Sequence, residues 1–537
     1  MKKRRSVRRP LFNLQSGITI LLCGLLLTAA GCQKSASSPE AAKPKTLRVA
    51  RASEPEWLNP VAGHQHADSD QAIFRGLFKI NEKNELVPDM AESWEASPDG
   101  KVYTIKLRSG IIWQDGKPFT ADDVKFTIET VQDPKNHSGL RKQLDRIEKV
   151  EVVDPLTVRI SLSQPMSPLP SKLKIGMIPK HALEGKDFNT DEFNHLRPVG
   201  TGPYRFGEWK RGEYLMLVPN PQFYGDKPKL DRVIYKFLPD PNVRLVQLKN
   251  NEIDIAQINP KQVPAVKESP ELELKVVETA DYRVMMFNLR FPLFQDVRVR
   301  QAIQFATDRK ALVDGALLGY GSPAYGPLQF HPKVPSSEIP RHDNDLNRAA
   351  ALLKEAGWSP GKEGIMEKEG RRLSFRLTVP ANDPIRADLG MLLSGQLKRA
   401  GIEAIVEVKD FGSFKINEME AFILGGGLPD EPDDDLYNFF SSHLGEDGSN
   451  YSGYKNPKID RLLEEGRSTL DPEARRKIYQ EIQKELVLDP PYNYLVYLKH
   501  IFVVRKGFTG FTQRIFGHGT SPLWNIEAWG LEKEGSV

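Results

Sequence analysis

The sequence predicts an α/β fold, because segments with the period of strands and segments with the period of helices alternate along it. Residues 46–50 and 102–108 alternate apolar and polar side chains, as half-buried strands do. Residues 298–318 repeat apolar side chains at the helical period. Residues 373–379, 384–400 and 402–408 indicate a strand, a helix and a strand, and such a unit requires a parallel pair of strands. Together these patterns favour an α/β architecture.

The elements of the first third of the chain carry clear boundary signals. The strand at 46–50 leads into a proline-rich turn at 54–60. The strand at 102–108 follows Ser97-Pro98-Asp99-Gly100, whose residue types are typical of a turn. Thr120 is the expected N-cap of a helix, since acidic residues fill the first turn behind it and apolar ones follow.

The later helices are predicted in the same way. Asp296 is the expected cap of a helix from about Arg298 to Leu318. A second helix, 347–356, is expected to end at Gly357. The buried face of the first helix is expected to consist of Val299, Ala302, Ile303, Phe305 and Ala306.

The composition is that of a soluble globular chain, and its positive charge is concentrated at the N-terminus. The chain has 537 residues, of which 39% are hydrophobic and 27% charged, with a formal net charge of +4. Six basic residues lie within the first nine positions, ahead of an apolar run from Ile18 to Leu27. That run is much shorter than the roughly 20 residues that a membrane-spanning helix needs. These features predict an export signal.

Small residues lead directly into a cysteine behind this signal. The stretch Thr28-Ala29-Ala30-Gly31-Cys32 resembles the lipobox of bacterial lipoproteins, although Ala29 replaces the usual leucine. The resemblance implies removal of residues 1–31 and lipidation of Cys32. Residues 33–45 then form a flexible tether. A retained signal anchor is the alternative.

Processing at this point would change the charge of the protein. Cleavage before Cys32 removes six of the 75 basic residues and none of the 71 acidic ones, so the 506-residue mature chain carries −2. No surplus of cations then remains to favour nucleic acid as a partner. The only other cysteine, Cys23, is lost with the signal, so the mature chain has no thiol for a disulfide or a cysteine-bound metal cofactor.

Ordered motifs lie at 88–95, 99–100, 103–110 and 113–124. In these motifs the chain shows a resemblance to the extracellular solute-binding protein family 5, the oligopeptide, dipeptide and nickel binding proteins of ATP-driven importers. Further blocks extend it over nearly the whole mature chain. They are 200–204, Asp296 with 298–302, 308–309, 453–457 and Asp460.

Membership in that family implies a two-lobed, periplasmic-binding-protein-like clamp of type II with an extra subdomain, closing on its ligand at a hinge. It also implies docking on two permease subunits and two ATPases. The chain would be exported and either lipid-anchored to the cell membrane or periplasmic, as a monomer without a cofactor. The expected parts are residues 1–31 as signal peptide, 32–45 as tether, 46–62 with 198–283 and 503–537 as lobe I, 63–197 as extra subdomain, and 284–502 as lobe II.

The same resemblance implies a ligand site between the end of the first strand and a strand of lobe II. The first side, Ser53 to Trp57, supplies Glu54 and Trp57, and the second is Leu424-Gly425-Gly426-Gly427. Pairing with a peptide main chain tolerates many side-chain sequences. Glycines leave room for a ligand backbone, while a flexible segment between the lobes is the alternative interpretation. The signature motifs themselves are turn, cap and core residues and are expected to identify the fold without touching ligand.

The acidic stretch behind these glycines departs from the peptide-binding pattern of the family. Peptide binders carry an aspartate there that pairs with the α-ammonium of the peptide, and the ungapped equivalent here is Leu428. A shift of one or two residues brings Asp430 to that place. Since a buried ammonium requires a carboxylate, either Asp430 anchors an amine or the ligand lacks one. A solvated acidic loop held open by Pro429 and Pro432 is the alternative.

Capture of di- or oligopeptides for delivery to a permease is therefore the expected function. A nickel chelate or a sugar is the alternative ligand, and His64-Gln65-His66 beside Asp68 is a weak candidate for metal binding. A sensory role with the same clamp stays open. An exported serine hydrolase or acyltransferase is the alternative from another class, because Ser-X-X-Lys occurs at 171–174, 359–362 and 452–455, but a Lys-Thr-Gly partner is missing.

Overall fold

A computed structural model of the chain describes residues 43–62, 68–188, 192–194, 196–334, 338–447, 449–519 and 521–532. The expected signal peptide, Cys32, most of the expected tether and His64-Gln65-His66 lie outside these residues. The proposals that depend on them therefore stay predictions.

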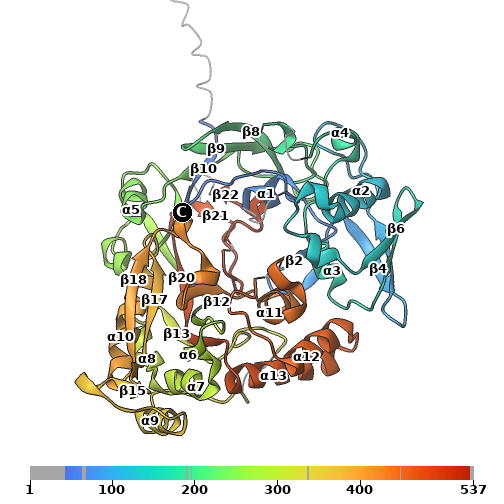
Figure 1. Cartoon of the computed structure of the whole chain (residues 1–537). Coiled ribbons are helices and arrows are strands. Elements are labelled where there is room, and N and C mark those ends of the chain that lie inside the picture. Colours follow the sequence, from blue (N-terminus) through green and yellow to red (C-terminus); the bar gives the residue numbers. More distant parts are fainter. Residues whose placement is uncertain are drawn as a thin grey trace, which may run out of the picture. The chain divides into compact units, whose positions relative to one another are not determined.

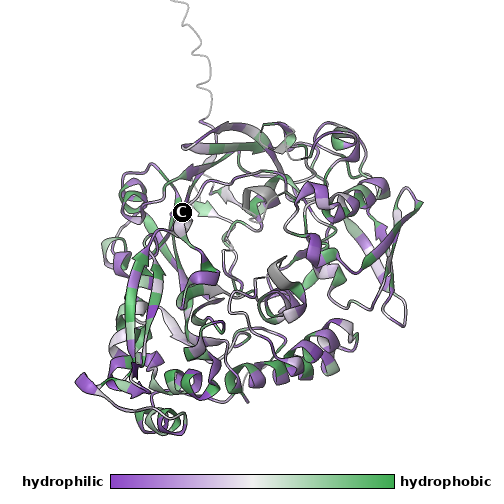
Figure 2. Cartoon of the chain, in the orientation of Figure 1, coloured by the Kyte–Doolittle hydropathy of each residue, from purple (hydrophilic) through white to green (hydrophobic). Residues whose placement is uncertain are grey.

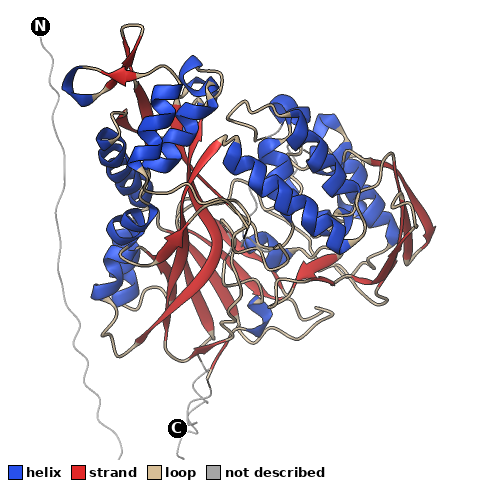
Figure 3. Cartoon of the chain, turned by 90° about the horizontal axis from the view of Figure 1, so that it is seen from below, coloured by secondary structure: helices blue, strands red, loops and turns tan. Residues whose placement is uncertain are grey.

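The centre of the described chain is an 11-stranded mixed sheet with helices packed along it (Figure 3). Its order is β18-β17-β19-β12-β20-β11-β1-β10-β9-β8, and β13 pairs with β20 off this path. The strands are β1 (Thr46–Arg51), β8 (Tyr204–Lys210), β9 (Tyr214–Pro219), β10 (Arg232–Phe237), β11 (Ile255–Ile258), β12 (Leu272–Phe287), β13 (Gly321–Pro323), β17 (Ser374–Pro380), β18 (Glu403–Lys409), β19 (Ala421–Gly426) and β20 (Tyr492–Arg505).

Two long strands connect the two ends of this sheet. β12 has 16 residues and β20 has 14, and they pair antiparallel from Leu272 opposite Arg505 to Met286 opposite Tyr492. On its other side β12 pairs with β19 through residues 282–287, and β20 pairs with β11 through residues 501–504. The pairing shifts its register between Glu278 and Tyr282 and again between Arg283 and Val284. This is the two-lobed α/β arrangement that the sequence predicts.

The predicted β-α-β unit is confirmed in lobe II. β17 pairs parallel with β18, from Ser374 opposite Glu403 to Pro380 opposite Lys409. Between them α10 (Pro384–Arg399) starts at its cap Asp383, whose side chain accepts from the Arg386 N–H. α10 buries leucines against both strands.

The single helix predicted for 298–318 is wrong, because the structure has two. α7 (Val297–Ala306) begins at Asp296, as predicted, and α8 (Arg309–Leu317) begins at a new cap, Asp308. The Thr307 hydroxyl donates to the Ile303 carbonyl at 2.7 Å, and the Ala311 N–H donates to Asp308 Oδ1 at 2.9 Å. These bonds end one helix and start the next within two residues. Most of the predicted buried face is confirmed, with Phe305 half-buried.

The predicted helix at 347–356 is confirmed as α9 (Leu346–Glu355), and Gly357 follows it with a φ of +87°. Other helices of lobe II are α6 (Pro292–Gln295), α11 (Pro432–Phe440), α12 (Pro457–Ser468) and α13 (Pro472–Leu488). Three short strands, β14 (Ser359–Pro360), β15 (Met366–Lys368) and β16 (Arg371–Arg372), form a small sheet. In the sequence they lie between α9 and α10. Figure 2 shows hydrophobic and hydrophilic residues alternating along α12 and α13, whose buried faces join the lobe II core.

The extra subdomain contains the predicted strand at 102–108 and the helix after Thr120. Its four-stranded sheet has the order β4-β5-β7-β6 and is covered by α2. Thr120 forms a capping box with Asp123, as the residue types predict. The strands are β2 (Phe78–Ile80), β3 (Leu86–Pro88), β4 (Ala91–Ala96), β5 (Val102–Leu107), β6 (Ile147–Asp154) and β7 (Thr157–Leu162), and the helices are α1 (Asp68–Ile73), α2 (Ala121–Gln132), α3 (Leu169–Lys172) and α4 (Lys180–Leu183).

The hydrophobic cores agree with this division only in part. The subdomain and most of lobe I share one continuous core, which includes Val158, Leu217 and Trp529. Lobe II has two main clusters of its own. The expected residue bounds of the parts therefore stay predictions. The segments expected to form lobe I also contain α5 (Pro241–Lys249), β21 (Phe508–Thr509) and β22 (Gly530–Leu531).

Candidate ligand-binding site

The predicted glycines end β19 at the point where the two lobes meet. β19 lies between β12 and β17, with Arg283 opposite Gly425 and Tyr282 opposite Gly426. Its ladder with β17 consists of Leu377 with Ala421 and Thr378 with Phe422. The rest of β19, including Leu424 and the glycines, extends beyond that ladder toward the C-terminal segment.

Each glycine meets a close neighbour. A Cβ on Gly427 would lie 1.8 Å from the Ala280 carbonyl oxygen, and the residue has a φ of +109°. A Cβ on Gly426 would lie 2.9 Å from the Tyr282 hydroxyl. These contacts favour a fixed backbone over a flexible segment.

Three positively charged or ionisable groups surround the third glycine. A Cβ on Gly425 would lie 2.8 Å from Arg386 Nη2, 2.9 Å from Arg283 Nη1 and 2.9 Å from His518 Cε1. The side chains come from α10, β12 and the C-terminal segment. We call Gly425, Arg283, Arg386 and His518 the cationic cradle. It places two guanidinium groups and an imidazole over a backbone position that has no side chain.

Both arginines of the cradle are buried, and Arg386 is only partly neutralised. The Arg283 and Arg386 side chains are 8% and 11% exposed. Burial, together with the charge of Arg283, lowers the pKa of Arg386 to about 10, even though Asp383 lies 3.0 Å from its Nε. A second anion near Arg386 would lower the free-energy cost of burying its positive charge.

Asp281, which lies at the register shift of β12, contacts two residues of the cradle. Its Oδ1 accepts from Arg283 Nη1 and lies 2.9 Å from His518 Nδ1, while its Oδ2 lies 2.8 Å from His500 Nε2. Burial alone would raise the pKa of Asp281, but Arg283 and His518 hold it well below its usual range. The backbone next to Asp281 is hydrogen-bonded to the C-terminal segment, because the Ala280 N–H donates to the Phe516 carbonyl at 2.7 Å. The carboxylate therefore joins β12, β20 and the C-terminal segment at one point.

The predicted residues of lobe I engage their own lobe. Glu54 accepts a hydrogen bond from Trp209 Nε1 at 2.8 Å and another from the Gly212 N–H at 3.1 Å. Trp57 is half-buried against the lobe I core. Neither residue is among those that the structure places around Gly425, and their roles in ligand binding stay predictions.

Asp430 follows β19 and points at a lysine. Its carboxylate forms an ion pair with Lys174 Nζ, which comes from the subdomain. Its role as an amine anchor also stays a prediction. Nearby Asp435 accepts from the Leu428 N–H at 2.8 Å, and burial raises the pKa of Asp435 to about 7.

The cradle residues have no local sequence motif in common. Arg283, Arg386 and His518 come from three distant segments, so only the fold brings them together. One signal was available: Arg386 lies in the first turn of α10, where the helix dipole disfavours a cation. A cation at that place indicates a role outside the helix.

Comparisons with known proteins show the family of the chain. The family model "Bacterial extracellular solute-binding proteins, family 5 Middle" matches residues 85–447. The chain belongs to family 5 of these solute-binding proteins. The sequence prediction of the family, and with it of the two-lobed clamp, is confirmed.

Family 5 relatives resemble nearly the whole chain. Protein XP55 of Streptomyces lividans is 34% identical, with 89% of this chain and 88% of the relative covered. The crystal structure of NikZ from Campylobacter jejuni in complex with Ni(L-His) is 36% identical, with a TM-score of 0.86 over 91% of this chain and 100% of that one. AppA from Bacillus subtilis, solved with a nonapeptide, is 28% identical with a TM-score of 0.81 and the same coverage.

Family 5 proteins are extracellular binding proteins of importers and not enzymes, and the Ser-X-X-Lys motifs here agree with that assignment. Burial would lower the pKa of Lys174, but Asp430 and Asp434 raise it. A lysine that acts as a general base needs a lowered pKa. Ser452 donates to Asn450 within its own turn. Ser359 donates to the Glu367 carbonyl on the paired strand β15.

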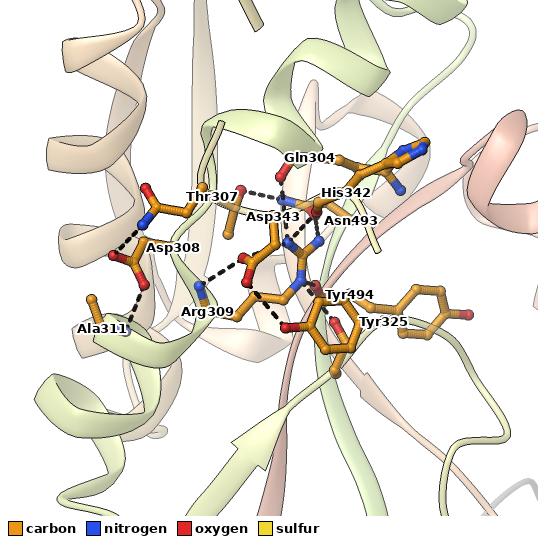
Figure 4. Close-up of polar contacts among 12 residues, drawn as sticks. Gln304, Thr307, Asp308, Arg309, Ala311, Tyr325, His342, Asp343, Asn493 and Tyr494 are labelled. Atoms are coloured by element: carbon orange, nitrogen blue, oxygen red, sulfur yellow. Dashed lines mark hydrogen bonds and ion pairs between the residues drawn. The ribbon is translucent and has the colours of Figure 1, made fainter. Parts of the chain in front are cut away.

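A buried arginine of a family 5 motif has a structural role in lobe II (Figure 4). Arg309 Nε donates to the carbonyls of Ala324 and Tyr494, both at 2.7 Å, and its Nη2 donates to Asn493 Oδ1 at 2.9 Å. Asp343 lies 3.1 Å from Nη1. Arg309 thus joins α8 to β20 and to the loop before α9.

No group of three or more histidine, cysteine, aspartate or glutamate side chains among the described residues is arranged to hold a metal ion. None of the described helices combines the length and apolar character needed to cross a bilayer.

Proposed function

We propose that this family 5 protein captures short peptides by their C-terminal carboxylate at the cationic cradle and delivers them to an importer. The observation that carries the proposal is the convergence of Arg283, Arg386 and His518 on Gly425. A carboxylate at this place would accept charge-assisted hydrogen bonds from the guanidinium groups, and Arg386 is otherwise incompletely neutralised. AppA, solved with a nonapeptide, supports peptide as the ligand class.

The position of the cradle suits a clamp. Arg386 lies on α10 within the expected lobe II, while Arg283 on β12 and His518 in the C-terminal segment lie within the expected bounds of lobe I. A ligand carboxylate would therefore contact groups from both lobes. Such a ligand favours the closed arrangement by its additional contacts there.

The remaining parts of the proposal follow the sequence predictions. The partners are two permease subunits and two ATPases in the cell membrane. The protein is held at that membrane by lipid on Cys32, with residues 33–45 as the tether. Glu54 and Trp57 contribute to the ligand site from lobe I, and Leu424 to Gly427 contribute from lobe II.

The test is calorimetric titration with trialanine, pentaalanine and their C-terminal amides. The proposed function predicts binding of the acids and a loss of at least about 30-fold in affinity for the amides, because deleting one partner of a buried charge pair costs about 2–5 kcal/mol. Arg386→Gln should weaken binding of the acids by a similar factor. Arg348→Gln is the control, since Arg348 pairs with Glu355 on the exposed face of α9. Equal affinity of acids and amides would refute the role of the cradle.

A second candidate ligand is a nickel chelate of an amino acid. His518 favours it, because a metal-binding imidazole usually has its other nitrogen bonded to a carboxylate, as His518 Nδ1 is to Asp281. NikZ, to which the chain is similar, was solved with Ni(L-His). Purified protein mixed with nickel and L-histidine should then retain stoichiometric nickel after desalting, and His518→Ala should lose it. Retention by neither protein would leave the peptide as the ligand.

A further inference from the structure

The segment behind β19 is rich in carboxylates, and most of them have partners within the chain. We call Asp430 to Asp435 the acidic turn. Asp433 lies 2.9 Å from Lys172 Nζ and 3.3 Å from Arg467 Nε. Glu431 lies 2.5 Å from Arg475 Nη2. Asp434 pairs with Lys172, and Asp430 pairs with Lys174.

The two lysines belong to a different part of the molecule. Lys172 ends α3 in the subdomain and Lys174 follows it, whereas the acidic turn leads into α11 of lobe II (Figure 1). Further contacts join the same two parts, such as the Ser167 N–H bonded to the Arg467 carbonyl at 2.7 Å. The lysines therefore reach the acidic turn where the subdomain meets lobe II.

Lys174 carries an ammonium group in this environment. Its Nζ contacts Asp430 Oδ2 and lies 3.6 Å from Asp434 Oδ2. Burial would lower the pKa of Lys174, but these two carboxylates raise it. The Lys174 side chain is 24% exposed and that of Asp430 is 15% exposed, so the ion pair is only partly shielded from solvent. Lys174 thus presents to Asp430 the same group that a free peptide N-terminus would present.

The rest of the acidic turn does not favour a second ammonium. Asp435 is the one remaining carboxyl of the turn, and its pKa of about 7, raised mainly by burial, keeps about half of it protonated near neutral pH. Glu431 and Asp433 are 8% and 2% exposed and are paired with arginine or lysine. A ligand amine would have to displace one of the cations of the chain.

Arg386 of the cradle and Arg514 are less well neutralised than these anions. Arg386 has a lowered pKa, as described above, and burial likewise lowers the pKa of Arg514 to about 10. Arg514 Nη1 donates to the Ile80 carbonyl at 3.2 Å. The balance of charge around the site therefore favours the anionic end of a ligand over its cationic end.

We propose that Lys174 is a specificity-determining residue, which supplies to Asp430 the ammonium group that a peptide would otherwise bring, so that ligands bind without a free amino group. This inference rests on the proposed function. It assigns recognition to the carboxylate end and extends the ligand class to N-blocked peptides and other carboxylates without an amine.

The experiment compares four probes by calorimetry: trialanine, pentaalanine and the N-acetylated form of each. The wild-type protein is expected to bind the free and acetylated forms with affinities that agree within about threefold. Lys174→Met exposes the Asp430 carboxylate, so this variant is expected to bind the free peptides at least about tenfold more tightly than the acetylated ones. Lys172 is left in place, since it neutralises Asp433 and Asp434.

Two further variants make the comparison specific. Lys174→Gln removes the charge but keeps a polar side chain, and it should show the same preference for a free amine as Lys174→Met. Lys180→Met is the matched control, because Lys180 lies in the same subdomain and pairs with Asp122 at 3.2 Å. It should behave as the wild type does.

The outcomes separate this inference from the proposed function. A loss of more than tenfold on acetylation in the wild-type protein overturns the inference, and this result needs no variant to fold. Equal affinities for free and acetylated peptides in folded Lys174→Met overturn it as well. Failure of every peptide to bind refutes the proposed function and the inference with it, whereas loss of binding on C-terminal amidation alone supports the cradle.

Discussion

Replacement of Asp435 by asparagine should make the protein more stable above neutral pH. Asp435 is buried, and its pKa is raised to about 7 from an ordinary value of 3.8, mainly by burial. Asparagine has nearly the same shape, and its carbonyl oxygen can still accept from the Leu428 N–H as Asp435 Oδ2 does. Asp435→Asn therefore removes the ionisation and keeps the hydrogen bond.

The sign of the effect follows from proton binding. Between pH 4 and 7 the folded protein keeps the Asp435 proton while the unfolded chain has lost it, so the free energy of unfolding falls as pH rises. Each pKa unit corresponds to about 1.4 kcal/mol. From pH 5 to pH 8 the stability gained by Asp435→Asn over wild type should therefore grow by roughly 3 kcal/mol.

The assay is urea denaturation of wild type and Asp435→Asn at pH 5, 6, 7 and 8. The difference in the free energy of unfolding should rise up to about pH 7 and then level off. Asp314→Asn is the control, because Asp314 is exposed on α8 beside Lys310. Parallel pH curves for wild type and Asp435→Asn would refute the assignment of a raised pKa to this residue.

Three other changes have defined outcomes. Arg309→Met should lower the free energy of unfolding by about 3–5 kcal/mol in urea denaturation, because it leaves buried carbonyls and a carboxylate without their partner. Gly427→Ala should lower the thermal midpoint and weaken ligand binding, since its Cβ would overlap the Ala280 carbonyl at a positive φ. Cys32→Ser should abolish labelling of the protein by radioactive palmitate in cells.

The controls for these changes use other sites of the same chain. Gly412→Ala should leave the thermal midpoint nearly unchanged, because its added Cβ would meet nothing within 4 Å. Folded Arg309→Met should bind ligand within threefold of wild type, and a larger loss would contradict its structural role. Equal palmitate labelling of wild type and Cys32→Ser would exclude Cys32 as the lipidation site.

Local sequence patterns predict the fold well where hydrophobic period and caps agree. The β-α-β unit of β17, α10 and β18 and the capping box at Thr120 follow from alternation and from residue types at helix ends. The helix predicted for 298–318 shows the limit of this reasoning. The hydrophobic period continues across Thr307 and Asp308, but their side chains bond to the backbone and divide the helix.

The ligand site is less accessible to sequence reasoning than the fold. The sequence indicates Leu424 to Gly427 through a resemblance. The structural reason for glycine at 427 is the close approach of Ala280, which lies on β12, far from residue 427 in the sequence. Arg283, Arg386 and His518 converge only through the register shift of β12 and the path of the C-terminal segment. The partner of Asp430 likewise depends on contact between the subdomain and lobe II.

The central claim is that the protein captures a ligand by its carboxylate at the cationic cradle. The most direct measurement is native mass spectrometry of the protein isolated from its own cells, followed by identification of the released ligand. The account predicts a short peptide or an amino-acid chelate with a free carboxylate, which Arg386→Gln should fail to retain. A bound ligand without a carboxylate, such as a neutral sugar, would contradict it.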